Sequence, residues 1–266
     1  MKTILLILLA CVTCANAVTT TLTNQHIDLS VNYNATLDDW MLTVRDESTD
    51  YDPGIDIRRR EFATDQVLLL GTTNSRLLIP ANPNFAFLGA AGDPVWILPQ
   101  SQNAQVLFAG LSGENKSASG WEGIGVSSDF LVKGVTSGTF LGNQVLFTLE
   151  SYSGPGNFFL YSNNQFGAPT IHMRTDNGLS SADAKTVGAG SHAHFNWAFT
   201  QPGTYAVGLR ASGTLAANSV FSASELTTFT FFIVPEPGVL GLLAAGGLLF
   251  FRRNKRKTNN SITKHD

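Results

Sequence analysis

Apolar and polar residues alternate with a period of two in short segments along most of the chain. The clearest case is residues 26–33, HIDLSVNY, in which every second side chain is apolar. Such alternation is typical of a β-strand that buries one face. Further strands are predicted over residues 40–44, 145–149, 158–161, 204–211 and 227–234. The 25 glycines and 10 prolines supply turns, so the pattern predicts an all-β fold, an immunoglobulin-like or jelly-roll-like antiparallel β-sandwich.

Residues 191–200, SHAHFNWAFT, are predicted to form one strand that carries two histidines. Side chains alternate between the two faces of a strand. The apolar face, which would contact the core, holds Ala193, Phe195, Trp197 and Phe199. The opposite face holds His192, His194, Asn196 and Ala198. Neighbours on one face are about 7 Å apart along the strand, which lets two imidazoles reach one metal ion.

The strand predicted over residues 26–33 has the same arrangement. Its apolar face holds Ile27, Leu29, Val31 and Tyr33. His26 and Asp28 lie on the other face. If the two strands are close together, His26, His192 and His194 form a three-histidine site for an ion such as zinc, and Asp28 supplies a fourth ligand or orients a ring. In the alternative, the histidines lie at the surface and bond only to neighbouring residues.

Two connecting segments complete the predicted domain. Residues 110–128 are rich in glycine and serine and are predicted to form a long loop or hairpin region. Pro202 and Gly203 suit a tight turn after the histidine strand. Tyr205 begins the next strand, and its hydroxyl is expected to bond back across this corner, as tyrosines do in immunoglobulin-like sandwiches.

The first 17 residues, MKTILLILLACVTCANA, have the layout of a secretory signal peptide. Lys2 precedes an apolar stretch, and Ala15 and Ala17 flank the expected cleavage site of signal peptidase. The alternative is a lipoprotein signal with Cys11 as the modified residue. Cys11 and Cys14 are the only cysteines, so the cleaved chain could form neither a disulfide nor a thiolate metal site.

The C-terminal region has three parts in a fixed order. It begins with Pro235, Glu236 and Pro237, continues with an uncharged, mostly apolar run over residues 238–251, and ends in a basic cluster that starts with Arg252 and Arg253. Fourteen helical residues rise about 21 Å, less than the roughly 30 Å of a bilayer's hydrocarbon core. This predicts a short transmembrane helix, with residues 258–266 as a cytoplasmic tail and the main domain outside. A plain tail anchor is the alternative.

This order of Pro-Glu-Pro, short apolar helix and arginine-rich end resembles the PEP-CTERM sorting signal of Gram-negative bacteria. The resemblance covers residues 235–257. It implies recognition by an exosortase, a membrane enzyme similar to cysteine transpeptidases, which removes the tail. The protein would then be anchored transiently in the inner membrane and transferred to the cell surface or the extracellular matrix.

The body of the chain carries a second resemblance. HAHFNWAFTQPGTYAVGL (residues 192–209) is similar to the closing motif of the choice-of-anchor M, or actinobacterial surface-anchored, domain. Residues 26–28, 83–89, 94–100 and 154–158 extend the similarity, which covers most of residues 24–234. The resemblance implies an exported β-rich domain that occurs with different anchors. In actinobacteria such domains are often encoded beside metal-type ABC transporters, an association that favours the metal hypothesis.

Charge and motif content narrow the function classes. Residues 18–234 contain 10 Lys and Arg and 18 Asp and Glu, a net charge of −8, which disfavours nucleic acid as a partner. Residues 46–56 hold an acidic cluster, in which residues 50–56 resemble a fragment of a calcium loop but lack its complete pattern, and Arg58–Arg60 can neutralise the cluster. No nucleophile elbow, phosphate-binding loop or dinucleotide fingerprint is present, so we expect no enzymatic activity.

The sequence therefore predicts a signal peptide (1–17), one β-rich domain (18–234), a sorting signal (235–257) and a tail (258–266). The expected function is structural or binding work at the cell surface or matrix, with envelope polysaccharide or surface proteins as partners. The first alternative is a metal-binding accessory protein that uses the three histidines, with zinc as the ion. The second is a secreted hydrolase with paired carboxylates.

Overall fold

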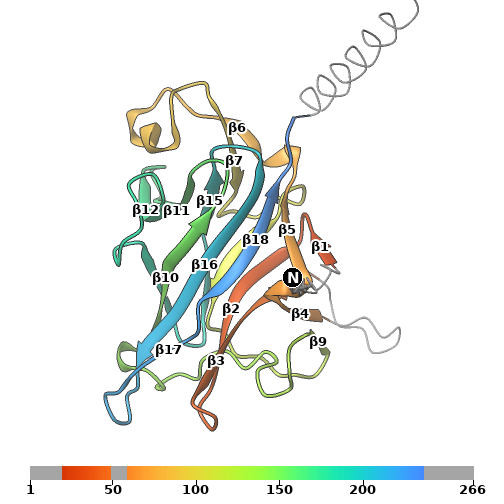
Figure 1. The fold of residues 1–266 in the computed structure, drawn as a ribbon, viewed down its shortest axis with the longest axis vertical. Coiled ribbons are helices and arrows are strands. Elements are labelled where there is room, and N and C mark those ends of the chain that lie inside the picture. The colour runs from red at the N-terminus through yellow and green to blue at the C-terminus, as the bar shows by residue number, and fades with distance from the viewer. Residues whose placement is uncertain (1–19, 49–58, 237–266) are drawn as a thin grey trace, which may run out of the picture.

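The computed structural model describes residues 20–48 and 59–236, which form three β-sheets (Figure 1). The largest sheet has seven strands in the order β1-β5-β18-β16-β10-β13, with β17 on the edge of β16. Its strands are β1 (Thr20–Leu22), β5 (Val67–Gly71), β10 (Gln144–Ser153), β13 (Ala184–Gly188), β16 (Gly203–Thr214), β17 (Phe221–Ala223) and β18 (Thr227–Ile233).

The other two sheets have six and five strands. The six-stranded sheet has the order β14-β8-β2-β3-β4-β9 and consists of β2 (His26–Asn34), β3 (Asp39–Asp46), β4 (Arg59–Ala63), β8 (Phe108–Ser112), β9 (Trp121–Ile124) and β14 (His192–His194). The five-stranded sheet has the order β12-β11-β15-β7-β6 and consists of β6 (Arg76–Leu78), β7 (Pro94–Leu98), β11 (Phe158–Asn163), β12 (Pro169–Arg174) and β15 (Asn196–Phe199). Short 3₁₀ helices connect some strands: η1 (Thr64–Gln66), η2 (Thr73–Ser75), η3 (Pro83–Leu88) and η4 (Leu141–Asn143).

The β-rich architecture agrees with the predicted sandwich, but the sheets are not purely antiparallel, so that part of the prediction was wrong. Among the described strands, four pairs are parallel: β1 with β5, β5 with β18, β2 with β8, and β4 with β9. Alternation within a strand specifies which residues face the core, but it carries no information on the direction of the neighbouring strand.

The predicted strand over residues 191–200 is two strands in two different sheets. β14 pairs with β8 in the six-stranded sheet, and β15 pairs with β7 and β11 in the five-stranded sheet. Phe195 lies at the break and is buried. Asn196 and Ala198 were expected on the side away from the core, but both are buried. Ala198 packs in a second apolar cluster with Ile79 and Leu88, and the side chain of Asn196 is hydrogen-bonded to Gln100.

One apolar core contains residues from all three sheets. Trp197 is fully buried at its centre, with its ring 5.7 Å from that of Phe231 in the seven-stranded sheet. Its indole nitrogen donates a hydrogen bond of 3.1 Å to the carbonyl of Ala109 in the six-stranded sheet. The predicted tyrosine corner is present, because the Tyr205 hydroxyl donates to the Gln201 carbonyl at 2.6 Å and accepts from its amide at 3.1 Å.

Strand β2 is buried on both faces, which the alternation did not predict. Its apolar residues enter the main core, and its polar face is covered by the segment that follows β8. In this segment, the Gly134 amide donates a 2.7 Å hydrogen bond to the side chain of Asn32. The region predicted as a loop over residues 110–128 contributes part of β8 and the whole of β9, and the residues that follow it cover β2.

Candidate metal centre

Three histidines that are distant in sequence meet at one edge of the six-stranded sheet. His26 is the first residue of β2, and His192 and His194 are the ends of β14. The Nε2 atoms of His26 and His194 are 3.0 Å apart. One ring nitrogen from each of the three histidines lies within 4.8 Å of the others. The structure therefore brings together the three residues that the sequence singled out.

Strand register explains this convergence. β8 lies between β2 and β14, and Gly110 of β8 is the direct neighbour of both Asp28 and His194. In a sheet, neighbouring residues in register point to the same face. Gly110 has no side chain to separate them, and a Cβ at this position would clash with Asp28 Oδ1 and crowd the His194 ring. The glycine thus lets Asp28 and His194 approach over the strand between them.

Asp28 is the buried member of the cluster. Only 1% of its surface is exposed, and among the described residues neither carboxylate oxygen takes part in a hydrogen bond. Its Oδ1 lies 3.8 Å from His194 Nε2. Burial raises the pKa of Asp28 to about 6, while the nearby His192 acts in the opposite direction. The sequence placed Asp28 on the polar face of its strand, and the structure shows that this face is interior.

The two inner histidines are held in the neutral form. Burial, together with the neighbouring His26 and His192, lowers the pKa of His194 to about 4. Burial also lowers the pKa of His26, and Glu47 partly opposes this effect. A neutral imidazole has the free lone pair that a metal ion needs. Both rings are therefore in the protonation state of a ligand at neutral pH.

Three charged residues, Glu47, Glu114 and Lys116, lie on the outer side of the histidine cluster. His192 Nδ1 lies 3.0 Å from Glu114 Oε2, and Lys116 Nζ lies 3.2 Å from the same oxygen and 2.8 Å from Glu47 Oε2. The pKa of Glu114 is lowered: burial acts to raise it, but Lys116 and His192 together outweigh that effect. Sequence analysis missed Glu114 and Lys116, because both lie in the segment that was predicted to be a loop.

Phe108 holds His194 in place by stacking on its imidazole ring. It precedes Gly110 by two residues on β8 and pairs in register with His26. Its ring stacks on that of His194, with 3.7 Å between centroids and an interplanar angle of 8°. The stack fixes the plane of the His194 imidazole, as a positioned ligand requires. Phe108 was also missed, since nothing in the sequence marks it apart from the other apolar strand residues.

The acidic cluster over residues 46–56 lies only partly within the described residues. Asp46 is buried, accepts a hydrogen bond from the Ser48 hydroxyl, and forms an ion pair of 3.3 Å with Arg60. The predicted neutralisation by the following arginines is present at this pair. The remaining acidic residues of the calcium-loop resemblance, residues 50–56, lie outside the part of the chain that the structure describes.

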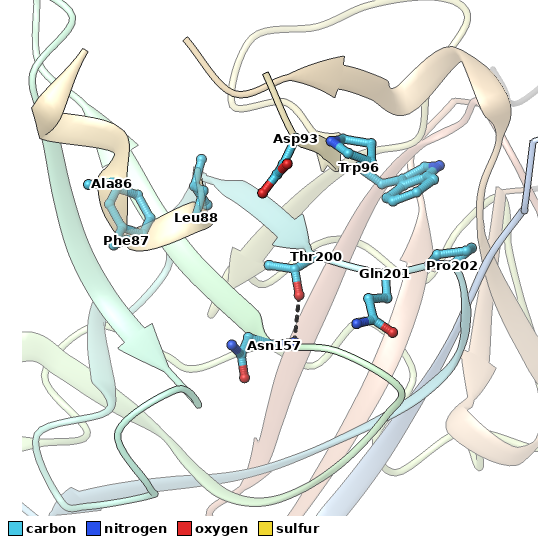
Figure 2. A pocket seen from close by; sticks show the side chains of 11 residues that line it. Ala86, Phe87, Leu88, Asp93, Trp96, Asn157, Thr200, Gln201 and Pro202 are labelled. Atoms are coloured by element: carbon cyan, nitrogen blue, oxygen red, sulfur yellow. Dashed lines mark hydrogen bonds between the residues drawn. The ribbon is translucent and has the colours of Figure 1, made fainter. Parts of the chain in front are cut away.

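A pocket of about 500 Å³ lies elsewhere, beside η3 and β7 (Figure 2). Asp93, Asn157, Thr200 and Gln201 are its polar lining, and the Asn157 amide donates a 2.8 Å hydrogen bond to Thr200 Oγ1. The described lining includes one carboxylate and no histidine, whereas glycoside hydrolysis uses a pair of carboxylates. The side chains with metal-binding chemistry gather at the histidine cluster instead.

Comparison with known proteins identifies the C-terminal signal. Residues 234–257 match the PEP-CTERM protein-sorting motif. No curated protein and no solved structure matches the chain. The motif marks a protein that is exported and processed at the membrane by an exosortase-type system. The predicted sorting signal is therefore confirmed.

The terminal predictions fall mostly outside the described residues. These include the signal peptide with Ala15 and Ala17, and Pro237, Arg252 and Arg253 of the sorting signal. Pro235 and Glu236 lie within the described part, directly after β18. In that part, no helix has the length and apolar character needed to cross a membrane. The short transmembrane helix predicted over residues 238–251 remains a prediction.

Proposed function

We propose that this exported protein is a metal-binding component of the cell envelope, with a divalent transition-metal ion held by His26, His192 and His194. Asp28 is the fourth ligand, and zinc is the ion that this donor set suits best. Three imidazoles and one carboxylate form a common tetrahedral zinc environment. Without cysteine ligands, the set offers only nitrogen and oxygen donors, which zinc accepts readily.

The unpartnered carboxylate of Asp28 is the single observation that carries the proposal. A buried charge without a partner costs several kcal/mol, and proteins rarely retain one without a reason. Here the carboxylate lies beside the imidazoles of His192 and His194 and accepts no hydrogen bond from the described residues. A bound cation would supply the missing partner.

The spacing of the histidine nitrogens supports the same proposal. In a tetrahedral site with zinc–nitrogen bonds of about 2.0–2.1 Å, two ligand nitrogens are about 3.3 Å apart. The Nε2 atoms of His26 and His194 are 3.0 Å apart, so a small rotation of either ring opens them to that spacing. His192 would be oriented through Nδ1 by Glu114, in the manner of a carboxylate that supports a zinc-bound histidine.

The first experiment is to measure zinc content and affinity in the purified protein by elemental analysis and calorimetry. We expect about one zinc per chain and its loss in His194→Ala and Asp28→Asn. His172→Ala is the matched control, since His172 is bonded to Ser162 on the five-stranded sheet and lies outside the cluster. Equal zinc binding by all four proteins, or none by the wild type while it is folded, would refute the proposal.

We also propose that residues 24–234 are related to the choice-of-anchor M domain. This resemblance supports a metal-binding role, because such domains are often encoded beside metal-type transporters in actinobacteria. A metal-free structural or binding role toward envelope polysaccharide or surface proteins is the competing function, and it requires no convergence of the histidines. We propose a binding protein rather than an enzyme, because the cluster offers four ligands to one ion and so leaves no free position for a substrate.

A further inference from the structure

A long uncharged segment covers one end of the domain. From Leu77 to Gly92 the chain has no acidic, basic or histidine residue, and most of its side chains are apolar. This segment, here called the neutral cap (residues 77–92), consists of the end of β6, η3 and the turns around them. Leu77 and Leu78 are 52% and 59% exposed, and Pro80, Ala81, Pro83, Ala86, Ala90 and Ala91 are also exposed.

The neutral cap lies at the end of the domain from which the sorting signal departs. β18 runs parallel to β5, and Ile233 pairs with Gly71 at the end of both strands. The chain leads from Gly71 into β6 through η2. Glu236 of the sorting motif forms an ion pair with Arg76, the residue that precedes the neutral cap. The exit of the sorting signal therefore lies beside the start of the neutral cap, at the same end of the domain as the rest of it (Figure 1).

The connection between the domain and the apolar run is very short. Only residues 234–237 separate the end of β18 from the apolar run that starts at residue 238. Four extended residues span at most about 14 Å, and the ion pair of Glu236 with Arg76 holds the first part of this connection against the domain. An apolar run inserted in a bilayer would therefore bring this end of the domain to the bilayer surface.

Charge distribution favours the same orientation. Residues 18–234 carry a net charge of −8, and charged groups are costly at the apolar boundary of a bilayer. The neutral cap presents exposed leucine, alanine and proline side chains without charge over 16 residues. Contacts of proteins with the membrane interface strengthen with the apolar area that they bury.

We propose that the neutral cap is a membrane-contact surface, which rests on the lipid bilayer while the sorting signal is inserted. The partner is the lipid interface itself. The contact orients the domain over the membrane and keeps the Pro-Glu-Pro segment at the bilayer surface, where a membrane-embedded sorting enzyme acts. Removal of the C-terminal tail ends the tether and with it the contact.

Single-cysteine labelling tests this surface directly. Cys11 and Cys14 are the only cysteines, so after their removal with the signal peptide, or their replacement by serine, an introduced cysteine carries the only label. We would attach an environment-sensitive fluorophore to Leu78→Cys and Ala90→Cys in the tail-bearing protein, reconstituted in phosphatidylcholine vesicles. Phe221→Cys on β17 is the matched control, because Phe221 is 68% exposed and β17 lies near the opposite end of the domain from β6 (Figure 1).

The expected result is a severalfold fluorescence increase and a blue shift at Leu78→Cys and Ala90→Cys, but not at Phe221→Cys. Quenching by lipids with a spin label on the acyl chain should follow the same order. Equal signals at all three positions would overturn the proposal. A signal at the cap that resists lipid quenchers and disappears as the protein is diluted in lipid would assign the surface to a second copy of the chain and would also overturn it.

Discussion

The six-stranded sheet carries two buried carboxylates on one face, and their surroundings differ. Glu61 of β4 is fully buried and accepts hydrogen bonds from Asn32 at 2.8 Å, Thr43 at 2.6 Å and the Val132 amide at 2.5 Å. It also forms an ion pair of 3.4 Å with the buried Arg45. Asp28 of β2 is also buried, but its carboxylate accepts no hydrogen bond from the described residues.

The difference separates a structural network from a candidate binding site. Every oxygen of Glu61 has a protein partner, so its charge is compensated within the fold. Asp28 has no hydrogen-bond partner among the described residues, and burial raises its pKa although His192, Arg45 and Lys116 act to lower it. The same sheet thus contains one carboxylate whose hydrogen bonds are complete and one that is open to the cation we propose.

The largest expected effect is the loss of Glu61. Glu61→Ala would leave the buried Arg45 guanidinium without its charge partner, and removal of one member of a buried pair costs about 3–5 kcal/mol. We expect the free energy of unfolding to fall by this amount, measured by urea denaturation, both with and without metal. A loss below about 1 kcal/mol, the range of exposed pairs, would contradict the structural role.

Addition of zinc should stabilise the folded protein, because the ion would bind the Asp28 carboxylate. An ion that binds only the folded state stabilises it by about 2.7 kcal/mol at a free concentration 100 times its Kd. Thermal unfolding with and without zinc should show this shift in the wild type and in His172→Ala. We expect no shift in Asp28→Asn. The same shift in Asp28→Asn would mean that zinc binds elsewhere.

The pH dependence of the metal-free protein gives an effect of similar size with a definite sign. Burial raises the folded-state pKa of Asp28 to about 6 from the 3.8 of an unperturbed aspartate, so the folded protein binds this proton more tightly than the unfolded chain. The contribution of Asp28 to stability is then most favourable below pH 4 and falls as pH rises through 6. Two pKa units correspond to roughly 3 kcal/mol at most.

Comparison with Asp28→Asn isolates this contribution from all other titrating groups. Without metal, the substitution should be relatively stabilising above pH 6, and its advantage should decrease as the pH is lowered toward 4. Urea denaturation of both proteins at several pH values measures the difference. A difference that is independent of pH would show that Asp28 titrates normally and would remove the electrostatic basis of the site.

The smallest expected effect concerns Glu114, which orients His192 from outside the cluster. Loss of such an outer partner typically weakens metal affinity by about 10–100-fold, and because Glu114 is partly exposed we expect Glu114→Gln to lie near tenfold. Isothermal calorimetry with zinc measures the change. Glu150→Gln is the control, since Glu150 pairs with Arg210 on the seven-stranded sheet. Equal affinities in the two variants would show that Glu114 has no positioning role.

Much of the fold could be predicted because local periodicity reports burial. The alternation over residues 26–33 marks β2, and that over 204–211 and 227–234 marks the long central strands of the seven-stranded sheet. The Tyr205 corner follows from turn chemistry. The break at Phe195 could not be predicted, because Phe195 fits the alternation and only the strands on either side direct β14 and β15 into different sheets.

The sequence predicted the three histidines of the candidate site but not the residues around them. His26, His192 and His194 stand out because histidine is a common metal ligand and each lies on the polar face of its predicted strand. Glu114, Lys116, Phe108 and Gly110 do not, because their roles depend on β8 lying between β2 and β14. That pairing joins segments that are at least 80 residues apart in the chain.

The sequence alone determined the β-rich character of the domain and the sorting signal at its end, because a period of two and an ordered tripartite motif are both local properties. Only the tertiary structure decided that the polar face of β2 is interior and that Asp28 lies there with no hydrogen-bond partner among the described residues. His26 and His194 are 168 residues apart in the chain. Their contact depends on parallel pairing of β2 with β8, and such long-range pairing leaves no signature in the residues of either strand.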